Sequence, residues 1–239
     1  MLNGQTDNKV GRTTGWFYNK KQVALRQKAF TLAEVLIVIG IIGIIANMTI
    51  PTLIENATEA QTRSGLKVAY SILSQAMTQI SSENSGTIAG ICEDFDDVCF
   101  KNMFKPALKY TKECNGQIAT NGCWASVQYL DGSSYSWIDN AGADSPAGLI
   151  LNNGMLVAFR WHYKNCAYPG NNKCGWIAVD INGFKKPNRW GKDTFNFHVA
   201  DGVVKPFGSV GDTGNDITCN PTDVGSDAGY GCASKYLYD

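Results

Sequence analysis

The sequence is poor in the residues and motifs from which catalytic centres are built. It contains two histidines, His162 and His198, in 239 residues, and neither lies in a recognisable catalytic motif. It has no G-x-S-x-G nucleophile motif, no H-E-x-x-H zinc motif and no glycine-rich phosphate-binding loop. Because no grouping of residues indicates acid–base or nucleophilic chemistry, the sequence predicts a protein that is not an enzyme.

Cysteine is absent from the first 91 residues, and the C-x-x-C spacing typical of zinc sites is absent throughout. All eight cysteines lie further along the chain. An even number of cysteines confined to one part of a chain indicates disulfides formed in an oxidising compartment. Spacing alone leaves other connectivities open, but it favours four local pairs: Cys92 with Cys99, Cys114 with Cys123, Cys166 with Cys174, and Cys219 with Cys232.

Acidic residues are scarce at the N-terminus. Residues 1–29 contain six lysines and arginines and one acidic residue, Asp7, so their net charge is +5, and the rest of the chain carries −5. A basic head followed by an apolar run and an acidic body predicts a membrane protein with its N-terminus in the cytoplasm. The body has no basic surplus, so binding to nucleic acid is not indicated.

Residues 30–50 form an apolar run of 21 residues that contains a single charge, Glu34. As a helix the run is about 31 Å long, which matches the hydrocarbon core of a bilayer, about 30 Å thick. Pro51 follows the run, and a proline removes one helical hydrogen bond. We therefore expect a membrane helix with a kink or a locally melted turn at residues 47–51.

Two ordinary interpretations of this run are a cleaved secretory signal and a plain single-span anchor. The run is longer than a typical signal peptide core, and no clear small-x-small cleavage site follows it. In a plain anchor, Glu34 is tolerated because it lies near the cytoplasmic interface. Neither interpretation gives the carboxylate a partner, although an unpaired charge in a bilayer costs at least a few kcal/mol.

The order of residues around Glu34 is more specific. Lys28 and the small Ala29 precede Phe30-Thr31-Leu32-Ala33-Glu34, and further apolar residues lead to Pro51. This order resembles the prepilin signal of type IV pilins and type II secretion pseudopilins, which usually has glycine where this chain has Ala29. The resemblance implies cleavage between Ala29 and Phe30 by a membrane prepilin peptidase, which then methylates the new amine of Phe30.

The resemblance also implies a role for Glu34 in assembly. Cleavage makes Glu34 the fifth residue of the mature chain, and in a staggered filament its carboxylate can meet the Phe30 ammonium of a neighbouring subunit. Each buried charge then has a partner, which sets the register of the subunits. The implied partners are the peptidase, other pilin or pseudopilin subunits, an inner-membrane assembly platform and membrane lipid, and the implied locations are the bacterial inner membrane and then a periplasmic or cell-surface filament.

The rest of the chain predicts an α+β fold in four parts: leader 1–29, membrane and assembly helix 30–51, amphipathic helix 52–86, and an exported β-rich domain 87–239. Apolar residues at helical spacing include Leu53, Ala57, Ala60 and Leu66, and Gly86 ends the pattern. We expect a short helix at 102–110 and an irregular segment at 205–239. Alternation and turn residues predict strands at 124–130, 134–138, 148–151, 155–159, 175–179, 194–199 and 203–204.

One loop of the exported domain is rich in hard oxygen donors. Asp180, Asn182, Asn188 and Asp193 lie around glycine turns, and calcium prefers such ligands. The same residue types are also those of tight turns, so the loop predicts either a structural calcium or a hydrogen-bonded turn. We expect most tryptophans of this domain to fill the interface between helix and sheet.

These features predict a structural subunit of a pilus or secretion pseudopilus. The alternative is a single-span protein whose disulfide-bonded domain recognises a ligand or adheres without polymerising. The two differ in the mature N-terminus, which is Phe30 only in the first case.

Overall fold

The computed structural model describes residues 30–134, 138, 146–167, 173–212, 218–220, 222 and 227–238, without the side chains of 55 and 56. The chain divides into two units, Met1–Ile50 and Pro51–Asp239. One helix, α1 (Leu32–Glu83), contributes to both units. The second unit also contains α2 (Asp97–Phe104), α3 (Cys232–Tyr238) and six strands, so it has the α+β, pilin-like arrangement that the sequence predicts.

The part of the first unit that the structure describes, residues 30–50, contains the beginning of α1. Among the described residues, α1 is the helix that is long and apolar enough to cross a membrane. Its large apolar side chains face outward, as Leu32 at 81% and Ile44 at 62% exposure illustrate. The helix continues through Pro51, so a locally melted turn at residues 47–51 is wrong, and the kink that we gave as its alternative stays a prediction. Residues on both sides of the proline are helical.

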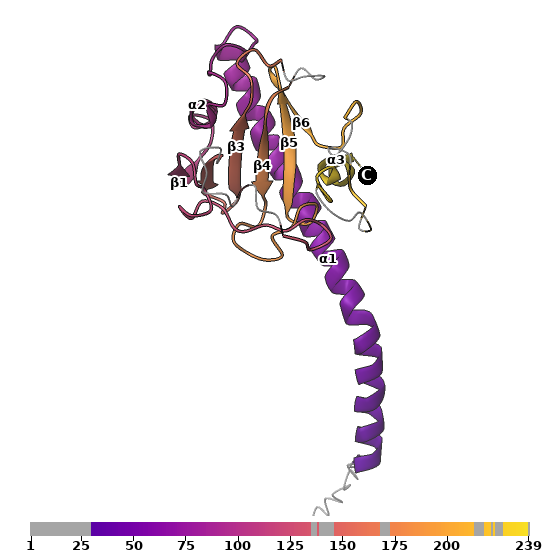
Figure 1. Cartoon of the computed structure of the whole chain (residues 1–239). Coiled ribbons are helices and arrows are strands. Elements are labelled where there is room, and N and C mark those ends of the chain that lie inside the picture. Colours follow the sequence, from indigo (N-terminus) through magenta and orange to yellow (C-terminus); the bar gives the residue numbers. More distant parts are fainter. Residues whose placement is uncertain are drawn as a thin grey trace, which may run out of the picture. The chain divides into compact units, whose positions relative to one another are not determined.

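The part of α1 in the second unit packs on the sheet (Figure 1). Its buried face begins at Thr62 and continues through Leu66, Leu73 and Ile80. The helix ends where Asn84 and Gly86 donate their backbone N–H groups to the carbonyl of Ser81, close to the end that the sequence predicts. The apolar stripe starts later than expected, because Leu53, Ala57 and Ala60 are exposed.

The sheet is an antiparallel meander in which the strands lie in chain order. Each strand pairs with the next one in the chain. The β2–β3 and β5–β6 connections are short, whereas residues 115–146 separate β1 from β2. The strands predicted at 148–151 and 155–159 are confirmed as β2 and β3, and a hairpin closed by a hydrogen bond from Gly154 N to the carbonyl of Leu151 joins them. The strands are β1 (Tyr110–Cys114), β2 (Ala147–Leu151), β3 (Leu156–Trp161), β4 (Lys173–Asp180), β5 (Thr194–Ala200) and β6 (Val203–Pro206).

Both faces of the central strands are covered. Val157 and Phe159 of β3 belong to a core that includes α1 and α2, whereas Leu156 and Ala158 belong to a second core on the opposite face. This explains why all six residues of β3 are buried. The expectation for the tryptophans is wrong, because Trp124 and Trp190 lie in the second core, away from α1. Trp161 packs on Phe100 of α2, with ring centroids 5.0 Å apart. Trp137 lies outside the described residues.

Several connecting segments differ from the prediction. The helix expected at 102–110 lies earlier, at α2, because Asp96 caps it by accepting a hydrogen bond from Cys99 N at 2.8 Å. The strand expected at 124–130 is replaced by isolated bridges at Gln128. Its Trp124 and Val127 are buried against the second face of the sheet instead. Residues 135–137, in the strand expected at 134–138, lie outside the described residues.

The C-terminal region is also more regular than expected, since α3 packs on β5 through Tyr236 and Phe195, whose ring centroids are 5.6 Å apart. The four disulfides join the neighbours that the spacing favours. They close short loops at α2, at the end of β1, at the start of β4 and at α3. Each such link removes conformations from the unfolded chain.

Candidate functional site

The residues at the start of α1 form a reciprocal hydrogen-bonded cap. Glu34 Oε2 accepts hydrogen bonds from the backbone N of Thr31 at 2.8 Å and from its hydroxyl at 2.9 Å. The backbone N of Glu34 donates to the Thr31 hydroxyl at 3.2 Å. This is a capping box, in which a threonine and a glutamate three residues later satisfy free N–H groups at a helix start. The T-x-x-E spacing was visible in the sequence, but our interpretation of Glu34 overlooked it.

The cap gives Glu34 a partner before any neighbouring subunit is present. It is formed by Thr31, one residue beyond the expected cleavage point between Ala29 and Phe30. Ala29 lies outside the described residues, whereas Phe30 is described and 84% exposed. Cleavage before Phe30 therefore leaves every atom of the cap in place. A carboxylate held at a helix N-terminus is also favoured by the helix dipole.

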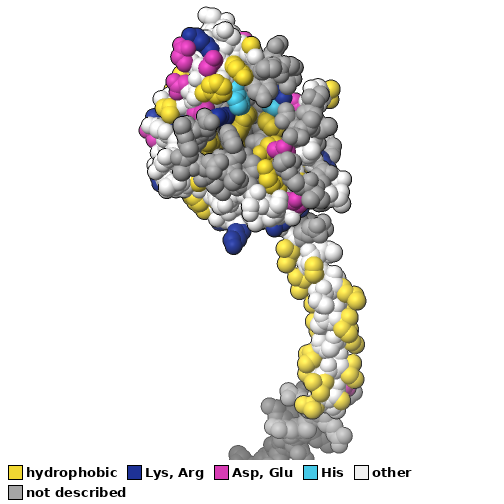
Figure 2. Space-filling view, in the orientation of Figure 1, with side chains coloured by type: hydrophobic (Ala, Val, Ile, Leu, Met, Phe, Trp, Pro, Cys, Tyr) yellow, Lys and Arg dark blue, Asp and Glu magenta, His cyan; other side chains and the backbone are white. Residues whose placement is uncertain are grey.

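The surface that follows the cap is apolar and uncovered. Every large apolar side chain from Leu32 to Ile54 is exposed, as Figure 2 shows along this part of α1. The hydroxyls of Thr49 and Thr58 donate to backbone carbonyls four residues earlier, so they do not interrupt this surface with unsatisfied polar groups. A Cβ built at Gly40 or Gly43 meets no atom within 4 Å, which leaves room for the close approach of another helix.

Residues 25–46 match the model of a family described as the prokaryotic N-terminal methylation motif. This chain carries the prepilin-type motif of type IV pilins and pseudopilins. The matched residues include the capping box and most of the exposed apolar helix, but none of the sheet. No curated protein and no solved structure matches the chain significantly. The motif thus identifies the N-terminal segment of a pilin-like precursor, and it does not extend into the globular unit.

Within that globular unit, the four predicted calcium ligands lie together at the end of β4. Asp193 accepts hydrogen bonds from the backbone N of Asn188 at 2.8 Å, from that of Arg189 at 2.7 Å and from the Asn182 side chain at 3.1 Å. Asp180, which is 1% exposed, accepts from the backbone N of Asn182 and from the Thr194 hydroxyl. The hydrogen bonds of the two carboxylates therefore hold the loop against the end of the sheet.

The protonation of these carboxylates follows from their burial. Burial, and secondarily the charge of Asp193, raises the pKa of Asp180 to about 8, so this group holds its proton at neutral pH. Burial also raises the pKa of Asp193, and the N–H groups that it accepts from oppose this.

This arrangement fits a hydrogen-bonded turn better than a calcium site. The oxygens of Asp193 already accept three N–H groups, and Asn182 presents a donor to this carboxylate. Asn188 Oδ1 is buried without a hydrogen-bond partner in the described part of the chain, and it is the one feature that favours a cation. The described residues contain no group of three or more His, Cys, Asp and Glu side chains placed to hold a metal ion.

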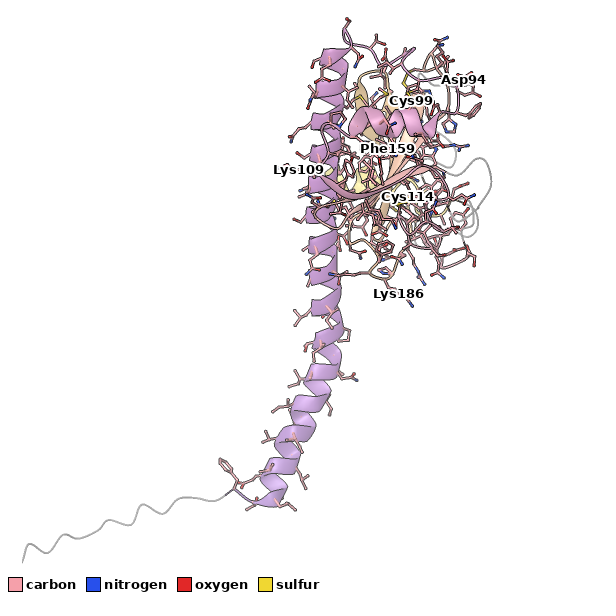
Figure 3. All side chains as sticks on the ribbon, turned by 90° about the vertical axis from the view of Figure 1, so that its left-hand side faces the viewer. Asp94, Cys99, Lys109, Cys114, Phe159 and Lys186 are labelled. Atoms are coloured by element: carbon pink, nitrogen blue, oxygen red, sulfur yellow. A yellow bond between two sulfur atoms is a disulfide. The ribbon has the colours of Figure 1, made fainter. Side chains whose placement is uncertain are left out.

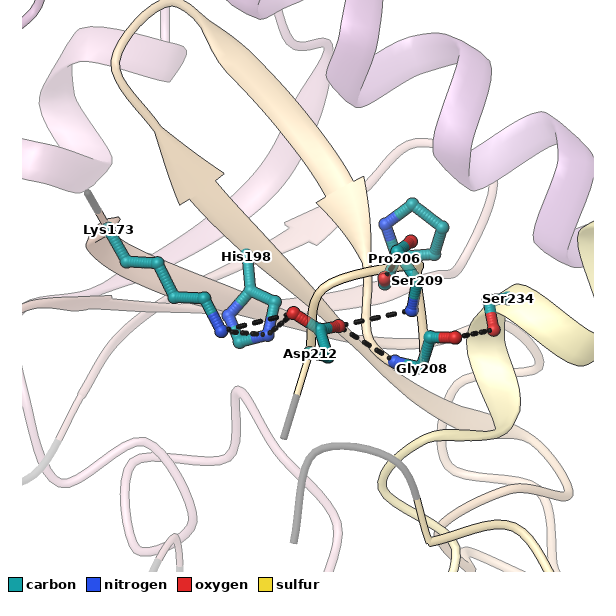
Figure 4. A network of polar contacts seen from close by, with 7 residues as sticks. All are labelled: Lys173, His198, Pro206, Gly208, Ser209, Asp212 and Ser234. Atoms are coloured by element: carbon teal, nitrogen blue, oxygen red, sulfur yellow. Dashed lines mark hydrogen bonds and ion pairs between the residues drawn. The ribbon is translucent and has the colours of Figure 1, made fainter. Parts of the chain in front are cut away.

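Both histidines take part in packing. His198 stacks on Phe207 with ring centroids 3.7 Å apart, and its Nε2 lies 2.7 Å from Lys173 Nζ (Figure 4). Asp212 lies 3.2 Å from the same ammonium and accepts the backbone N–H groups of Gly208 and Ser209. This network ties the loop after β6 to β4 and β5. His162 packs edge-on against Phe95, and burial lowers its pKa to about 4.

Proposed function

We propose that this chain is the precursor of a type IV pilin-like or pseudopilin-like structural subunit. The prepilin peptidase cleaves it between Ala29 and Phe30 and methylates the new N-terminus. The mature subunit then polymerises through the first part of α1, either into a surface pilus or into a secretion pseudopilus. The matched motif supports the processing step, and the uncovered apolar helix supports the assembly step.

The observation that carries this proposal is a capped carboxylate at the beginning of an uncovered apolar helix. An ordinary membrane anchor also has outward-facing apolar residues, but it does not need an acid five residues into the run. In the proposed filament, the Phe30 ammonium of a neighbour competes with Thr31 for the carboxylate of Glu34. An ammonium paired with a carboxylate forms a stronger interaction than a neutral N–H donor does. Both buried charges are then compensated, and the stagger between subunits is fixed.

The proposal also specifies where the precursor resides. The basic leader keeps residues 1–29 in the cytoplasm, and α1 anchors the precursor in the inner membrane beside the peptidase. The sheet and its four disulfides lie on the oxidising side of that membrane. An assembly platform in the inner membrane extracts the mature subunit from the lipid and adds it to a filament of pilin or pseudopilin subunits.

The mature N-terminus tests the proposal directly. The full chain is expressed in a bacterium that has a prepilin peptidase and in a matched strain without one, and the intact mass and N-terminal peptide are measured. We expect a chain that begins with N-methylated Phe30 in the first strain and an uncut chain in the second. An uncut or differently cut chain in both strains would favour a membrane-anchored binding domain that does not polymerise.

Substitutions at Ala29 sharpen this experiment. Ala29→Gly introduces the residue that is usual in the family, so cleavage is retained or improved. Ala29→Leu places a bulky side chain next to the scissile bond, so the precursor accumulates. Equal processing of the leucine variant would contradict cleavage at this peptide bond.

A further inference from the structure

Lys101 is a buried lysine in the second turn of α2. Its side chain is 0% exposed, although lysine is almost never fully buried unless it is paired. It lies on a face of α2 that packs against the sheet together with Phe100 and Phe104. The amine is therefore held between the helix and the segment that follows it, and its partners decide what it can do.

Two side chains contact this amine, one from β1 and one from the residue that follows β1. The carboxylate of Glu113 lies 3.2 Å from Lys101 Nζ, and the side-chain carbonyl oxygen of Asn115 contacts the same atom. The carbonyl carbon of Asn115 is one bond from that oxygen, so the amine, the amide and the carboxylate form one cluster. Figure 3 shows the region, with Cys99 on α2 and Cys114 at the end of β1 labelled.

We propose that Lys101 and Asn115 become joined by an intramolecular amide bond, formed after folding with Glu113 as the group that transfers the proton. An amine and a side-chain amide do not react at a useful rate in free solution. Held in contact within a fold, they gain the large effective concentration of an intramolecular reaction. The carboxylate beside them supplies acid–base assistance, as in general acid–base catalysis.

The reaction balances without an oxidant or an added reactant. Glu113 takes one proton from the Lys101 ammonium, and the free electron pair on Nζ attacks Cγ of Asn115. The Nζ–Cγ bond forms, and the bond between Cγ and Nδ2 breaks. Nδ2 leaves as ammonia after taking a second hydrogen from Nζ, and then accepts the proton held by Glu113. The products are an amide and an ammonium ion, and Glu113 returns to its starting state.

The surroundings of Glu113 and Asn115 suit these roles. The Lys105 ammonium hydrogen-bonds to Glu113 at 2.6 Å and, with Lys101, lowers the pKa of that carboxyl. Glu113 is therefore ionised at neutral pH and able to accept a proton. Asn115 is exposed as a residue, so the released ammonia can leave to solvent.

The bond would add a covalent link that reduction does not break. It closes the chain between α2 and the edge strand β1, next to the disulfide that joins Cys114 to Cys123. Edge strands have one unpaired side and are among the weaker parts of a sheet. A cross-link there restricts the unfolded chain in the same way as a disulfide, but independently of redox conditions.

Mass spectrometry of the full-length protein, reduced and denatured, tests the proposal. We expect the mass to be lower than that of the reduced chain by one ammonia molecule. We also expect a branched tryptic peptide in which Lys101 is linked to Asn115 and resists trypsin. A full mass together with tryptic cleavage after Lys101 would overturn the proposal, as would loss of ammonia without the branched peptide.

Four variants assign the roles of the side chains. Lys101→Met and Asn115→Ala each remove a reacting group and should restore the full mass, and Glu113→Gln should greatly reduce the cross-linked fraction. Lys112→Met is the matched control, because Lys112 lies on the same strand but donates to the backbone carbonyls of Asn121 and Gly122. It should retain the ammonia loss. Continued loss of ammonia in the Asn115→Ala variant would show that another residue is modified.

Discussion

The first part of α1 and the sheet of the globular unit place the same kinds of side chain in opposite environments. From Leu32 to Ile54 the large apolar residues are exposed, whereas Val157, Phe159 and Phe197 in the sheet are fully buried. Burying one such side chain contributes about 1.5–3 kcal/mol. In the sheet this free energy stabilises the folded unit, and in the helix it is available for lipid or for other subunits.

This difference indicates that the globular unit and the exposed helix have separate roles. The globular unit contains two cores and four disulfides, so its stability derives from contacts within one chain. The exposed helix has a satisfied N-terminal cap but no apolar partner in the described residues. Substitutions in the exposed part of the helix should therefore change assembly without unfolding the sheet. Substitutions in the cores of the sheet should lower the stability of the globular unit without removing the assembly surface.

The largest expected effect follows from removing the charge of Glu34. Glu34→Gln retains an oxygen that can accept from Thr31, so the capping box survives, but it cannot compensate the Phe30 ammonium of a neighbour. Leaving one charge of a buried pair unpaired costs about 3–5 kcal/mol. We expect incorporation into filaments to fall at least about 100-fold, measured by quantitative blotting of sheared filaments, while peptidase cleavage is unchanged.

Glu59→Gln is the matched control on the same helix, because Glu59 pairs with Arg63 on an exposed surface at 2.9 Å. An exposed pair of this kind contributes little, so incorporation should stay close to that of the unmodified chain. Normal filaments from Glu34→Gln would show that the charge is not required for assembly.

The next effect contrasts a buried leucine with an exposed isoleucine. Leu73 is 1% exposed and belongs to the core between α1 and the sheet, together with Met155 and Val157. Leu73→Ala should lower the free energy of unfolding of the globular unit by about 2–5 kcal/mol. Ile44→Ala, at a site that is 62% exposed, should leave it unchanged. Denaturant titration in detergent, followed by tryptophan fluorescence, measures the free energy of unfolding of both variants. Equal effects would contradict separate roles for the helix and the globular unit.

The central strands of the sheet were largely predictable because their sequences contain clear strand and turn signals. The strands around residues 152–154 flank an Asn-Asn-Gly turn, and β4 and β5 are rich in aromatic and β-branched residues. The edge strand β1 was missed because its Tyr-Thr-Lys-Glu sequence is polar and four of its five residues are exposed. A strand without a buried face has no apolar alternation from which it can be predicted.

The residue types of the prepilin-type motif were predictable from the sequence, but the hydrogen bonds of Glu34 were not predicted. The basic leader, Glu34 and the apolar run define the prepilin-type motif by residue order alone. The capping box was accessible from the T-x-x-E spacing and was overlooked. The cluster of Lys101, Glu113 and Asn115 could not be predicted, because Lys101 lies on a helix and its partners lie at an edge strand. Only the packing of α2 on the sheet brings these side chains together.

A smaller effect is the dependence of the stability of the globular unit on pH. Because the pKa of Asp180 is raised to about 8, the folded state binds more protons than the unfolded state from about pH 4 to pH 8. Stability is therefore lost as the pH rises through this window. The pKa of His162 is lowered to about 4 and that of Asp97 is raised to about 6, so these two groups have little influence above pH 6.5.

Between pH 6.5 and 8 we expect the free energy of unfolding to fall by about 2 kcal/mol, since each unit of pKa difference corresponds to about 1.4 kcal/mol. Urea titrations at several pH values measure this slope. In Asp180→Asn, which cannot ionise, most of the slope should disappear. A slope that persists in this variant would assign the proton to another group.

The smallest effect that we expect is that of calcium on the globular unit. A calcium ion would need the oxygens of Asp193, but these already accept N–H groups from Asn182, Asn188 and Arg189. It would also have to displace the proton of Asp180, which burial stabilises. The melting temperature in millimolar calcium should therefore differ from that in a chelator by less than about 1 °C, because a ligand stabilises a fold only as far as it binds the folded state.

Asp193→Asn separates the two interpretations of this loop. If the carboxylate serves as a hydrogen-bond acceptor, the variant loses a charge-assisted interaction with backbone N–H groups, and its stability falls equally with and without calcium. If the carboxylate serves as a calcium ligand, the variant is weakened only when calcium is present. A calcium-dependent rise of several degrees in the unmodified chain, absent from this variant, would mean that the stability of the globular unit depends on a bound ion.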